Sequence, residues 1–306
     1  MDLISLNDWS DDDLIALLDL ASAMKAVIRR PIKKVPTLRG KAVANVFFEA
    51  STRTRNSFEL AGKYLGADVI NFQGSGSSIE KGETLWDTVR TLQAMRLDAV
   101  VVRHGASGVP QVMAEHLEVP VINAGDGTHH HPTQGLLDVM TVRERFGHVE
   151  GLTVAIVGDV LHSRVARSDI EGFVRLGAKI RLVGPPSLMP SGLESQHVAV
   201  YADLKDGLAG VDVIQVLRIQ KERQQSGQIP SLREYHDRWG LTQAALHWAQ
   251  PKVLVLHPGP QNRGVEIDSQ VMEDPVHSAI LDQVENGVAV RMAVLYRLIG
   301  GEGVSA

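Results

Sequence analysis

The chain has 306 residues, of which 44% are hydrophobic and 22% charged, a composition typical of a soluble globular protein with room for two domains. Its formal net charge of −5 gives no reason to expect nucleic acid or an anionic membrane as a partner, so anionic ligands would need local basic clusters. The absence of cysteine excludes disulfides, thiolate metal sites and thiol catalysis. The N-terminus is acidic and no apolar run approaches about 18 residues, so we expect no membrane segment and a cytoplasmic location.

The first predicted elements are a helix, a strand and a second helix. Ser10 followed by three aspartates is typical of a helix N-terminus, and leucines at helical spacing extend this helix to about Arg30, before Pro31. A short apolar run at 43–48 predicts a strand. From Phe58 onward, apolar residues at helical spacing predict the second helix.

Between that strand and that helix lies a segment dense in hydrogen-bond donors, Ser51-Thr52-Arg53-Thr54-Arg55. A helix N-terminus has unpaired N–H groups and a partial positive charge, Ser and Thr can cap it, and Arg can bind a phosphate through two hydrogen bonds. The alternative is a capped surface helix with two solvated arginines. This density of donors directly after a buried strand favours an oxyanion or phosphate site.

The segment 74–82 contains three glycines and three serines. This composition predicts a mobile surface loop, and a plain linker is the alternative. Ser77 and Lys81 in this segment are donors of the kind that bind phosphate. A helix at about 84–96 and a strand at 98–102 follow, and the strand ends at Arg103. Because ligands of open α/β sheets bind at the carboxyl ends of strands, Arg103 is a candidate for carbonyl and phosphate oxygens.

Three adjacent histidines, 129–131, follow a further predicted strand at 119–123. A metal site is disfavoured because neighbours in a row cannot all face one ion, and no Glu or Cys stands at ligand spacing. We expect His129 and His130 to be solvated loop residues. Pro132 at the first position of a long helix at 132–146 fits helix initiation, and this helix should connect two domains.

The second half of the chain repeats the alternation of strands and helices, with strands at 152–159, 179–185, 211–217 and 253–256. The pattern predicts an α/β protein of two three-layer domains with mostly parallel sheets, joined by long helices. A dinucleotide-binding oxidoreductase is the alternative for this half. It is disfavoured because only Gly158 of a Gly-x-Gly-x-x-Gly fingerprint is present, and no acidic residue ends the second strand.

Several basic residues of this half follow predicted strands. Arg164 opens a helix and Arg167 lies one turn later, where a salt-bridge role is the alternative to ligand binding. A basic segment begins at Arg218, and we expect it to run as a loop to about Tyr235. An exposed charged loop without a binding role is the alternative.

Four separated motifs resemble, in order, those of the aspartate and ornithine carbamoyltransferases, and the resemblance covers nearly the whole chain. They are Phe47-Phe48-Glu49-Ala50-Ser51-Thr52-Arg53-Thr54-Arg55, His131-Pro132-Thr133-Gln134, Arg218-Ile219-Gln220 and His257-Pro258-Gly259-Pro260. The last differs from the usual His-Pro-Leu-Pro of the family. A role for backbone carbonyls survives the change to Gly259, but glycine makes the loop less stiff.

The resemblance implies transfer of the carbamoyl group of carbamoyl phosphate to the α-amine of L-aspartate. The products are N-carbamoyl-L-aspartate and phosphate, a step of pyrimidine biosynthesis that needs no cofactor or metal. Residues 1–132 are expected to bind carbamoyl phosphate and residues 133–285 to bind aspartate. The helix at 286–306 is expected to return to the first domain.

The resemblance also assigns roles to individual residues. The phosphate is expected to bind Ser51, Thr52, Arg53 and Thr54, with Ser77 and Lys81 supplied by a neighbouring subunit of a homotrimer. The carbonyl oxygen is assigned to Thr54, Arg103 and His131, and the nitrogens to Gln134 and the carbonyls of Pro258 and Gly259. Aspartate is assigned to Arg164, Arg218 and Gln220, together with Lys81.

Aspartate is favoured over ornithine because a β-carboxylate needs a cation such as Arg218, whereas the δ-ammonium of ornithine needs carboxylates. Ornithine enzymes also carry a Cys that this chain lacks. The remaining alternatives are a carbamoyltransferase for another amino acid and a non-catalytic assembly scaffold. The Gly259 variant resembles bacterial members that assemble with dihydroorotase, which is therefore a candidate partner.

Overall fold

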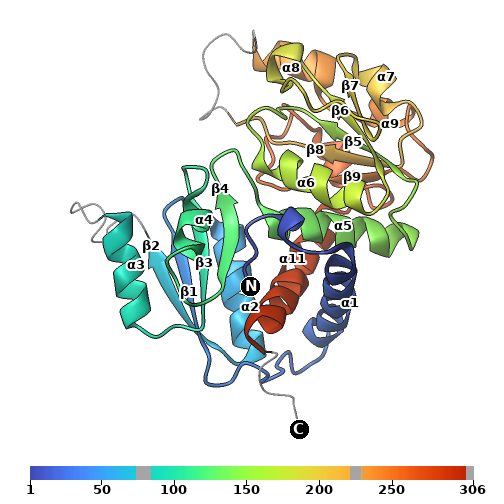
Figure 1. Cartoon of the computed structure of the whole chain (residues 1–306). Helices are drawn as coiled ribbons and strands as arrows, with labels where there is room; N and C mark the ends of the chain where they lie inside the picture. Colours follow the sequence, from blue (N-terminus) through green and yellow to red (C-terminus); the bar gives the residue numbers. More distant parts are fainter. Residues whose placement is uncertain (74–83, 221–228, 230, 301–306) are drawn as a thin grey trace. The chain divides into compact units, whose positions relative to one another are not determined.

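The computed structural model describes residues 1–73, 84–220, 229 and 231–300. The chain forms two compact units, one of Met1–Leu137 with Glu285–Ala306 and one of Asp138–Val284 (Figure 1). It passes from one unit to the other within two helices, α5 (Pro132–Phe146) and α11 (Ile280–Leu295). Each unit contains a parallel sheet with helices packed on it, so the predicted α/β class is confirmed. No described helix is both long enough and apolar enough to cross a membrane.

The sheet of the first unit has the strand order β2-β1-β3-β4 with all pairs parallel. Its strands are β1 (Ala42–Phe47), β2 (Asp68–Gln73), β3 (Ala99–His104) and β4 (Val121–Asp126). The order reverses direction after β2. Right-handed crossovers therefore place the helix between β1 and β2 on one face of the sheet and the helices of the next two connections on the other. The carboxyl ends of β1, β3 and β4 consequently lie side by side at one edge of the sheet.

The helices of the first unit are α1 (Asp11–Ile28), α2 (Thr52–Leu65), α3 (Leu85–Ala94) and α4 (Val109–Ala114), with a short 3₁₀ turn at Leu6–Asp8. Alternate residues of β1 and β3, such as Val46 and Val102, pack with Leu92 of α3 and Met113 of α4 in one apolar cluster. Helix α2 packs against β1 and β2, and its Phe58 is almost completely buried. The unit is therefore a three-layer sandwich.

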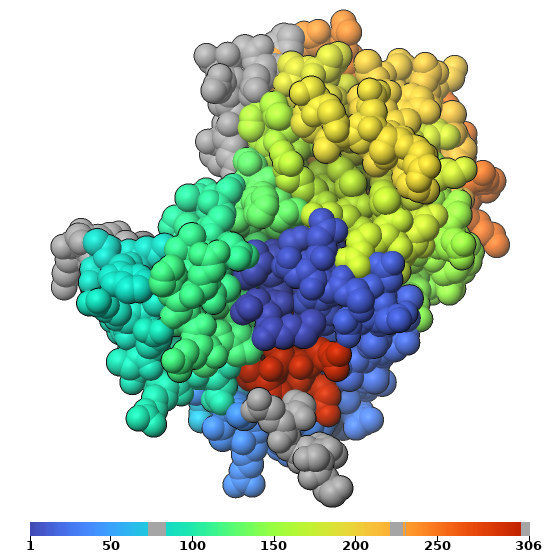
Figure 2. All heavy atoms as spheres, in the orientation of Figure 1, coloured from blue at the N-terminus to red at the C-terminus, as the bar shows by residue number. Residues whose placement is uncertain are grey.

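Residues from the first and the last described parts of the chain lie side by side in the first unit, as Figure 2 shows on one face. Ser10 caps α1 as expected, accepting a hydrogen bond from the Asp13 N–H at 3.1 Å. The Arg29 guanidinium donates two hydrogen bonds, of 2.8 and 2.7 Å, to Glu285 in α11. Arg297, in the short π-helical segment Tyr296–Gly300 that follows α11, donates to Asp13 at 2.9 Å. These ion pairs connect α11 and the π-helical segment after it to the two ends of α1.

The sheet of the second unit has the strand order β7-β6-β5-β8-β9, again with all pairs parallel. Its strands are β5 (Thr153–Val157), β6 (Lys179–Val183), β7 (Val198–Tyr201), β8 (Val213–Val216) and β9 (Leu254–Leu256). The order reverses between β5 and β8. Ligands of open parallel sheets bind at the carboxyl ends of strands beside such a switch point.

Helices cover both faces of this second sheet. They are α6 (Arg164–Arg175), α7 (Leu204–Leu208), α8 (Leu232–Trp239), α9 (Gln243–Leu246) and α10 (Ser269–Met272), with a 3₁₀ turn at Pro186–Leu188. Ile214 and Val216 of β8 pack with α7, α9 and α10 in one cluster. Gln215 alternates with them and therefore points to the other face, where α6 packs against β6.

The expectation that the basic loop runs to about Tyr235 is wrong, because α8 begins at Leu232. Ser231 caps this helix by accepting a hydrogen bond from the Glu234 N–H at 3.0 Å. Leu232, Tyr235 and Trp239 then form an apolar stripe that packs on Leu188 and Ile219. The helical spacing of these three apolar residues could have predicted α8 from the sequence, but the charged residues around them obscured the pattern.

Candidate active site

The donor-rich segment 51–55 follows β1 and opens α2, so that residues 52–55 form the first turn of the helix and do not precede it. Ser51 occupies the N-cap position of α2, but its side chain makes no capping hydrogen bond. Thr54 is buried, whereas Thr52 and Arg53 are exposed. The first N–H groups of α2 therefore lie beside an exposed guanidinium and a buried hydroxyl, and this combination favours an oxyanion.

Arg103, the penultimate residue of β3, lies between the segments that follow β1 and β4. Its Nη1 donates a hydrogen bond to the Ala124 carbonyl at 3.2 Å, and its Nε lies 3.3 Å from Oε2 of Glu49. Its own carbonyl accepts a hydrogen bond from the Phe48 N–H at 2.9 Å. Sequence reasoning did not single out Glu49, although it was the one acid in a motif of donors.

His131 and Gln134 are both buried at the start of α5. The His131 carbonyl accepts hydrogen bonds from the N–H groups of Gln134 and Gly135, at 2.8 and 3.2 Å. These bonds close the first helical turn, so the backbone from which both side chains project is ordered by α5 itself.

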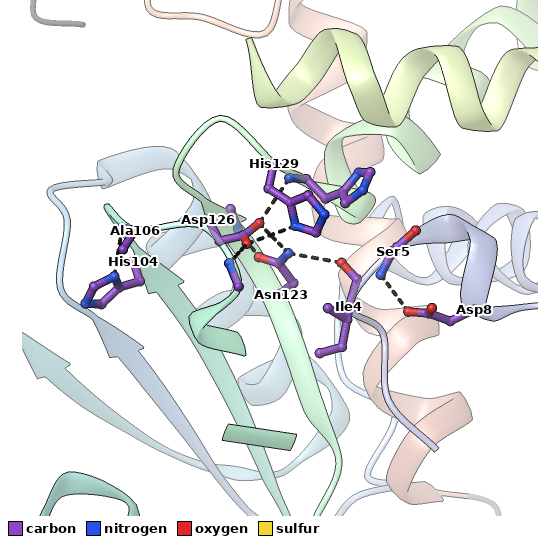
Figure 3. A network of polar contacts seen from close by, with 11 residues as sticks. Ile4, Ser5, Asp8, His104, Ala106, Asn123, Asp126 and His129 are labelled. Atoms are coloured by element: carbon purple, nitrogen blue, oxygen red, sulfur yellow. Dashed lines mark hydrogen bonds and ion pairs between the residues drawn. The ribbon is translucent and has the colours of Figure 1, made fainter. Parts of the chain in front are cut away.

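Asp126 at the end of β4 connects the loop after β3 with the loop that carries the histidines (Figure 3). It is completely buried and accepts hydrogen bonds from the Asn123 amide at 2.9 Å and from the N–H groups of His130 and Gly108 at 3.0 and 2.7 Å. His129 Nδ1 lies 3.1 Å from Asp126 Oδ2, the oxygen that also accepts from Gly108. Sequence reasoning missed Asp126, whose only signal was a lone acid between two glycines.

The expectation that His130 is solvated is wrong, because only 9% of its surface is exposed. Its backbone N–H is drawn inward by Asp126, and its ring makes an edge contact with that of His129, with centroids 3.9 Å apart. The His129 side chain remains 43% exposed. The described residues contain no cluster of acids and histidines able to hold a metal ion.

The predicted residues of the second unit follow three neighbouring strands. Arg164 is buried at the first position of α6 after β5, where Ser163 caps the helix by accepting from the Ala166 N–H at 3.1 Å. Arg218 and Gln220 are half-buried after β8, and Pro258 and Gly259 are half-buried after β9. Since β5, β8 and β9 are adjacent and parallel, these residues lie along one edge of this sheet.

Tyr235 lies beneath this edge and was not identified as a site residue. A Cβ atom added to Gly158 would be 3.1 Å from its hydroxyl oxygen, which makes no hydrogen bond with the described residues. Burial, together with the negative charges of Glu266 and Asp159, raises the pKa of Tyr235 far above its usual value. The hydroxyl is therefore neutral at physiological pH.

The structure thus brings together the predicted residues within each unit. The first unit gathers Ser51, Thr52, Arg53, Thr54, Arg103, His131 and Gln134, and the second gathers Arg164, Arg218, Gln220, Pro258 and Gly259. Ser77 and Lys81 lie outside the described residues. The first set suits an oxyanion, and the two guanidiniums of the second set suit a dicarboxylate.

Comparison with known protein families finds a matching family model for each half of the chain. Residues 1–144 match the family model of the aspartate/ornithine carbamoyltransferase carbamoyl-P binding domain, and residues 150–298 match that of its Asp/Orn binding domain. The chain belongs to the aspartate/ornithine carbamoyltransferase family. This finding confirms the resemblance read from the four sequence motifs.

Individual members of the family are similar over nearly their whole length. The aspartate carbamoyltransferase catalytic subunit of Anaeromyxobacter sp. (strain K) is 56% identical over 304 residues, which are 99% of this chain and 97% of that protein. The crystal structure of aspartate transcarbamoylase from Trypanosoma cruzi with carbamoyl phosphate and aspartate has a TM-score of 0.88 at 33% identity, covering 97% and 96% of the two chains. An ornithine carbamoyltransferase from Pyrococcus furiosus has a TM-score of 0.87 at 28% identity, covering 98% and 97%.

Replacement of Asp126 tests the connection between the two loops of the first unit. In Asp126→Ala, buried N–H donors of Gly108, Asn123 and His130 lose their acceptor, and we expect the free energy of unfolding to fall by about 2–4 kcal/mol. Urea denaturation at fixed protein concentration measures this change. Exposed Glu118 of the same unit provides the control Glu118→Ala, and equal stability of both variants would contradict the role of Asp126.

Proposed function

We propose that this chain is an aspartate carbamoyltransferase, which transfers the carbamoyl group of carbamoyl phosphate to the α-amine of L-aspartate in pyrimidine biosynthesis. The observation that carries this proposal is the pair of guanidiniums, Arg164 and Arg218, at the ends of neighbouring strands of the second unit. Two such groups match the two carboxylates of aspartate. The 56% identical relative bears the same activity in its name.

In this proposal the first unit binds carbamoyl phosphate. The start of α2 with Ser51, Thr52, Arg53 and Thr54 holds the phosphate, and Arg103, His131 and Thr54 face the carbonyl oxygen. Arg103 is already held by Glu49 and the Ala124 carbonyl, so little reorganisation is needed when negative charge develops on that oxygen. Prearranged donors of this kind contribute much of the rate enhancement in acyl transfer.

The second unit supplies the nucleophile in this proposal. Arg164 binds the α-carboxylate of aspartate and Arg218 with Gln220 binds its β-carboxylate, so the α-amine is held in line with the carbonyl carbon. The new C–N bond forms as the bond from carbon to the phosphate oxygen breaks. The departing phosphate takes the amine proton, and Gln134 and the carbonyls of Pro258 and Gly259 hold the nitrogens.

Ornithine is the second candidate substrate, because the Pyrococcus furiosus ornithine carbamoyltransferase has nearly the same TM-score as the aspartate enzymes. Fold similarity therefore does not separate the two. The charge of the site separates the two substrates, since Arg218 would repel the δ-ammonium of ornithine and attract the β-carboxylate of aspartate. We propose aspartate for this reason.

Removal of the Arg53 guanidinium tests the phosphate site. We expect kcat/KM of Arg53→Ala to fall by about 10²–10³ or more while the fold is retained, because a charged donor to the phosphate is lost. Steady-state assays of carbamoyl aspartate formation with circular dichroism measure both properties. Exposed Arg39 provides the control Arg39→Ala, which should have normal kinetics. Near-normal turnover of a folded Arg53→Ala protein would refute the assignment.

A second replacement separates aspartate from ornithine. Arg218→Gln should raise KM for aspartate about 10- to 100-fold, the effect of losing a charged hydrogen bond, and should leave KM for carbamoyl phosphate within about threefold. Arg233→Gln, at an exposed position of α8, is the matched control. An unchanged KM for aspartate in Arg218→Gln, or a wild-type protein that prefers ornithine, would exclude the proposed role.

We further propose that the enzyme is a cytoplasmic homotrimer with shared active sites, and that dihydroorotase is a partner worth testing. The trimer rests on the expectation that Ser77 and Lys81 act in a neighbouring subunit. Mixing inactive Arg53→Ala with inactive Lys81→Ala protein should restore part of the activity, because some sites then receive both intact contributions. Activity that stays absent at every mixing ratio would argue against Lys81 acting in trans.

A further inference from the structure

The turn that follows β9 is held from both sides by buried groups. The ring of His257 accepts a hydrogen bond at Nδ1 from the Gly259 N–H at 2.8 Å, and its Nε2 lies 3.2 Å from Oε1 of Glu266. Because an N–H can only donate, Nδ1 is the unprotonated nitrogen and Nε2 carries the hydrogen that faces Glu266. Glu266 also accepts from the Asn262 N–H at 2.5 Å.

A chain of buried side chains continues inward from the backbone of His257. The His257 N–H donates to Gln283 Oε1 at 2.9 Å, and Gln283 Nε2 donates to Asp138 Oδ1 at 2.6 Å. Gln215 Nε2 then lies 3.0 Å from Asp138 Oδ2 and 3.1 Å from Asp169 Oδ2. All four of these side chains are at most 3% exposed. They come from α11, α5, β8 and α6, all within the second unit.

Asp138 and Asp169 are neighbouring buried carboxyls at the inner end of this chain. Two adjacent carboxyls without water do not both ionise, and Asp169 and Asp138 share a side-chain hydrogen bond. Burial first, and then the charge of Asp138, raise the pKa of Asp169 well above its usual range. The protonated form of Asp169 is therefore favoured, and Asp138 accepts hydrogen bonds from Gln215 and Gln283.

A buried charge is a poor means of stabilising a core. Apolar residues of similar volume at such positions are often as stabilising or more so, whereas hydrogen bonds between buried polar side chains hold those side chains in one geometry. The outer end of this network is the backbone N–H of His257, one residue before Pro258. Because the network ends on the backbone that leads into Pro258, a role in orienting this turn explains it better than a role in stabilising the core.

We propose that Gln283, Asp138, Gln215 and Asp169 are positioning residues, which hold the Pro258–Gly259 carbonyls at the carboxyl end of β9 in the orientation that the reacting nitrogens require. The proposal rests on the proposed function, since those carbonyls matter only if they meet the amine and the carbamoyl nitrogen. Small displacements at a reacting centre can lower the rate by about 10². Gly259 has φ +62°, and a glycine gives the loop little stiffness of its own. The loop alone therefore does not prevent such displacements.

Gln283→Met tests the proposal in the full-length protein, because it keeps the side-chain volume and removes both hydrogen bonds. We expect kcat to fall by about 10- to 100-fold, with KM for carbamoyl phosphate and for aspartate within about threefold. Gln270→Met makes the same chemical change at an exposed position of α10 and should leave kcat unchanged. A folded Gln283→Met protein with the kcat of the wild type overturns the proposal.

A pair of variants at Asp169 keeps the test decisive if Gln283→Met does not fold. Asn has an N–H donor where the protonated acid has its O–H, so Asp169→Asn should retain at least a third of kcat. Asp169→Leu removes the donor and should lower kcat about tenfold or more in protein that circular dichroism shows to be folded. Equal kcat in both variants contradicts the positioning role.

The wild-type assay separates this inference from the proposed function. If the wild type carbamoylates ornithine and not aspartate, the proposed substrate is wrong, and the same comparison of variants is made with ornithine. A wild type without any carbamoyl transfer overturns both proposals. An active wild type with unaffected Gln283 and Asp169→Leu variants overturns the positioning network alone.

Discussion

Parallel pairing of strands is the constraint on which the rest of this structure depends. The register of β1 on β3 sets Phe47 beside Arg103, and the register of β3 on β4 sets His104 beside Asp126. Residues more than 50 positions apart in the chain therefore reach the same edge of the sheet. A shift of one residue in the pairing of β1 with β3 would turn Arg103 to the opposite face. The chemistry proposed for the first unit thus depends on hydrogen bonds between backbone groups, although the groups proposed to contact the ligand are side chains.

Buried acids organise the loops at both sheet edges. Asp126 gathers the backbone N–H groups of two loops in the first unit, and Asp138 in the second unit accepts from Gln215 and Gln283. Each acid is completely buried, which costs solvation unless every oxygen has donors. In the first unit a buried acid thus orders the loop that leads to His131, and in the second unit Asp138 reaches the backbone before the turn after β9 through Gln283.

Much of the fold and many of the candidate residues could be predicted from the sequence, and the reasons differ by residue. Alternating apolar strands and helices predicted the α/β class, Arg103 was found at the end of a strand, and Arg164 and Arg218 were found through the resemblance to the family. Asp126 and Glu49 were missed because a single acid in a polar loop has no pattern, and its importance comes from partners elsewhere in the chain. The same holds for Asp169 and Gln215, whose roles depend on a contact between α6 and β8. His130 and Tyr235 were misplaced because charged or polar neighbours hid their burial.

The passage of α5 and α11 from one unit to the other has a consequence for synthesis on the ribosome. Residues 138–284 form the second unit as one uninterrupted stretch, whereas the first unit needs residues from both ends of the chain, including Glu285 and Arg297. During translation the second unit can be complete before the first has received its closing helix. The earliest part of the polypeptide to be made is then the last to finish folding, and cellular chaperones would meet it with its α11-binding surface still open.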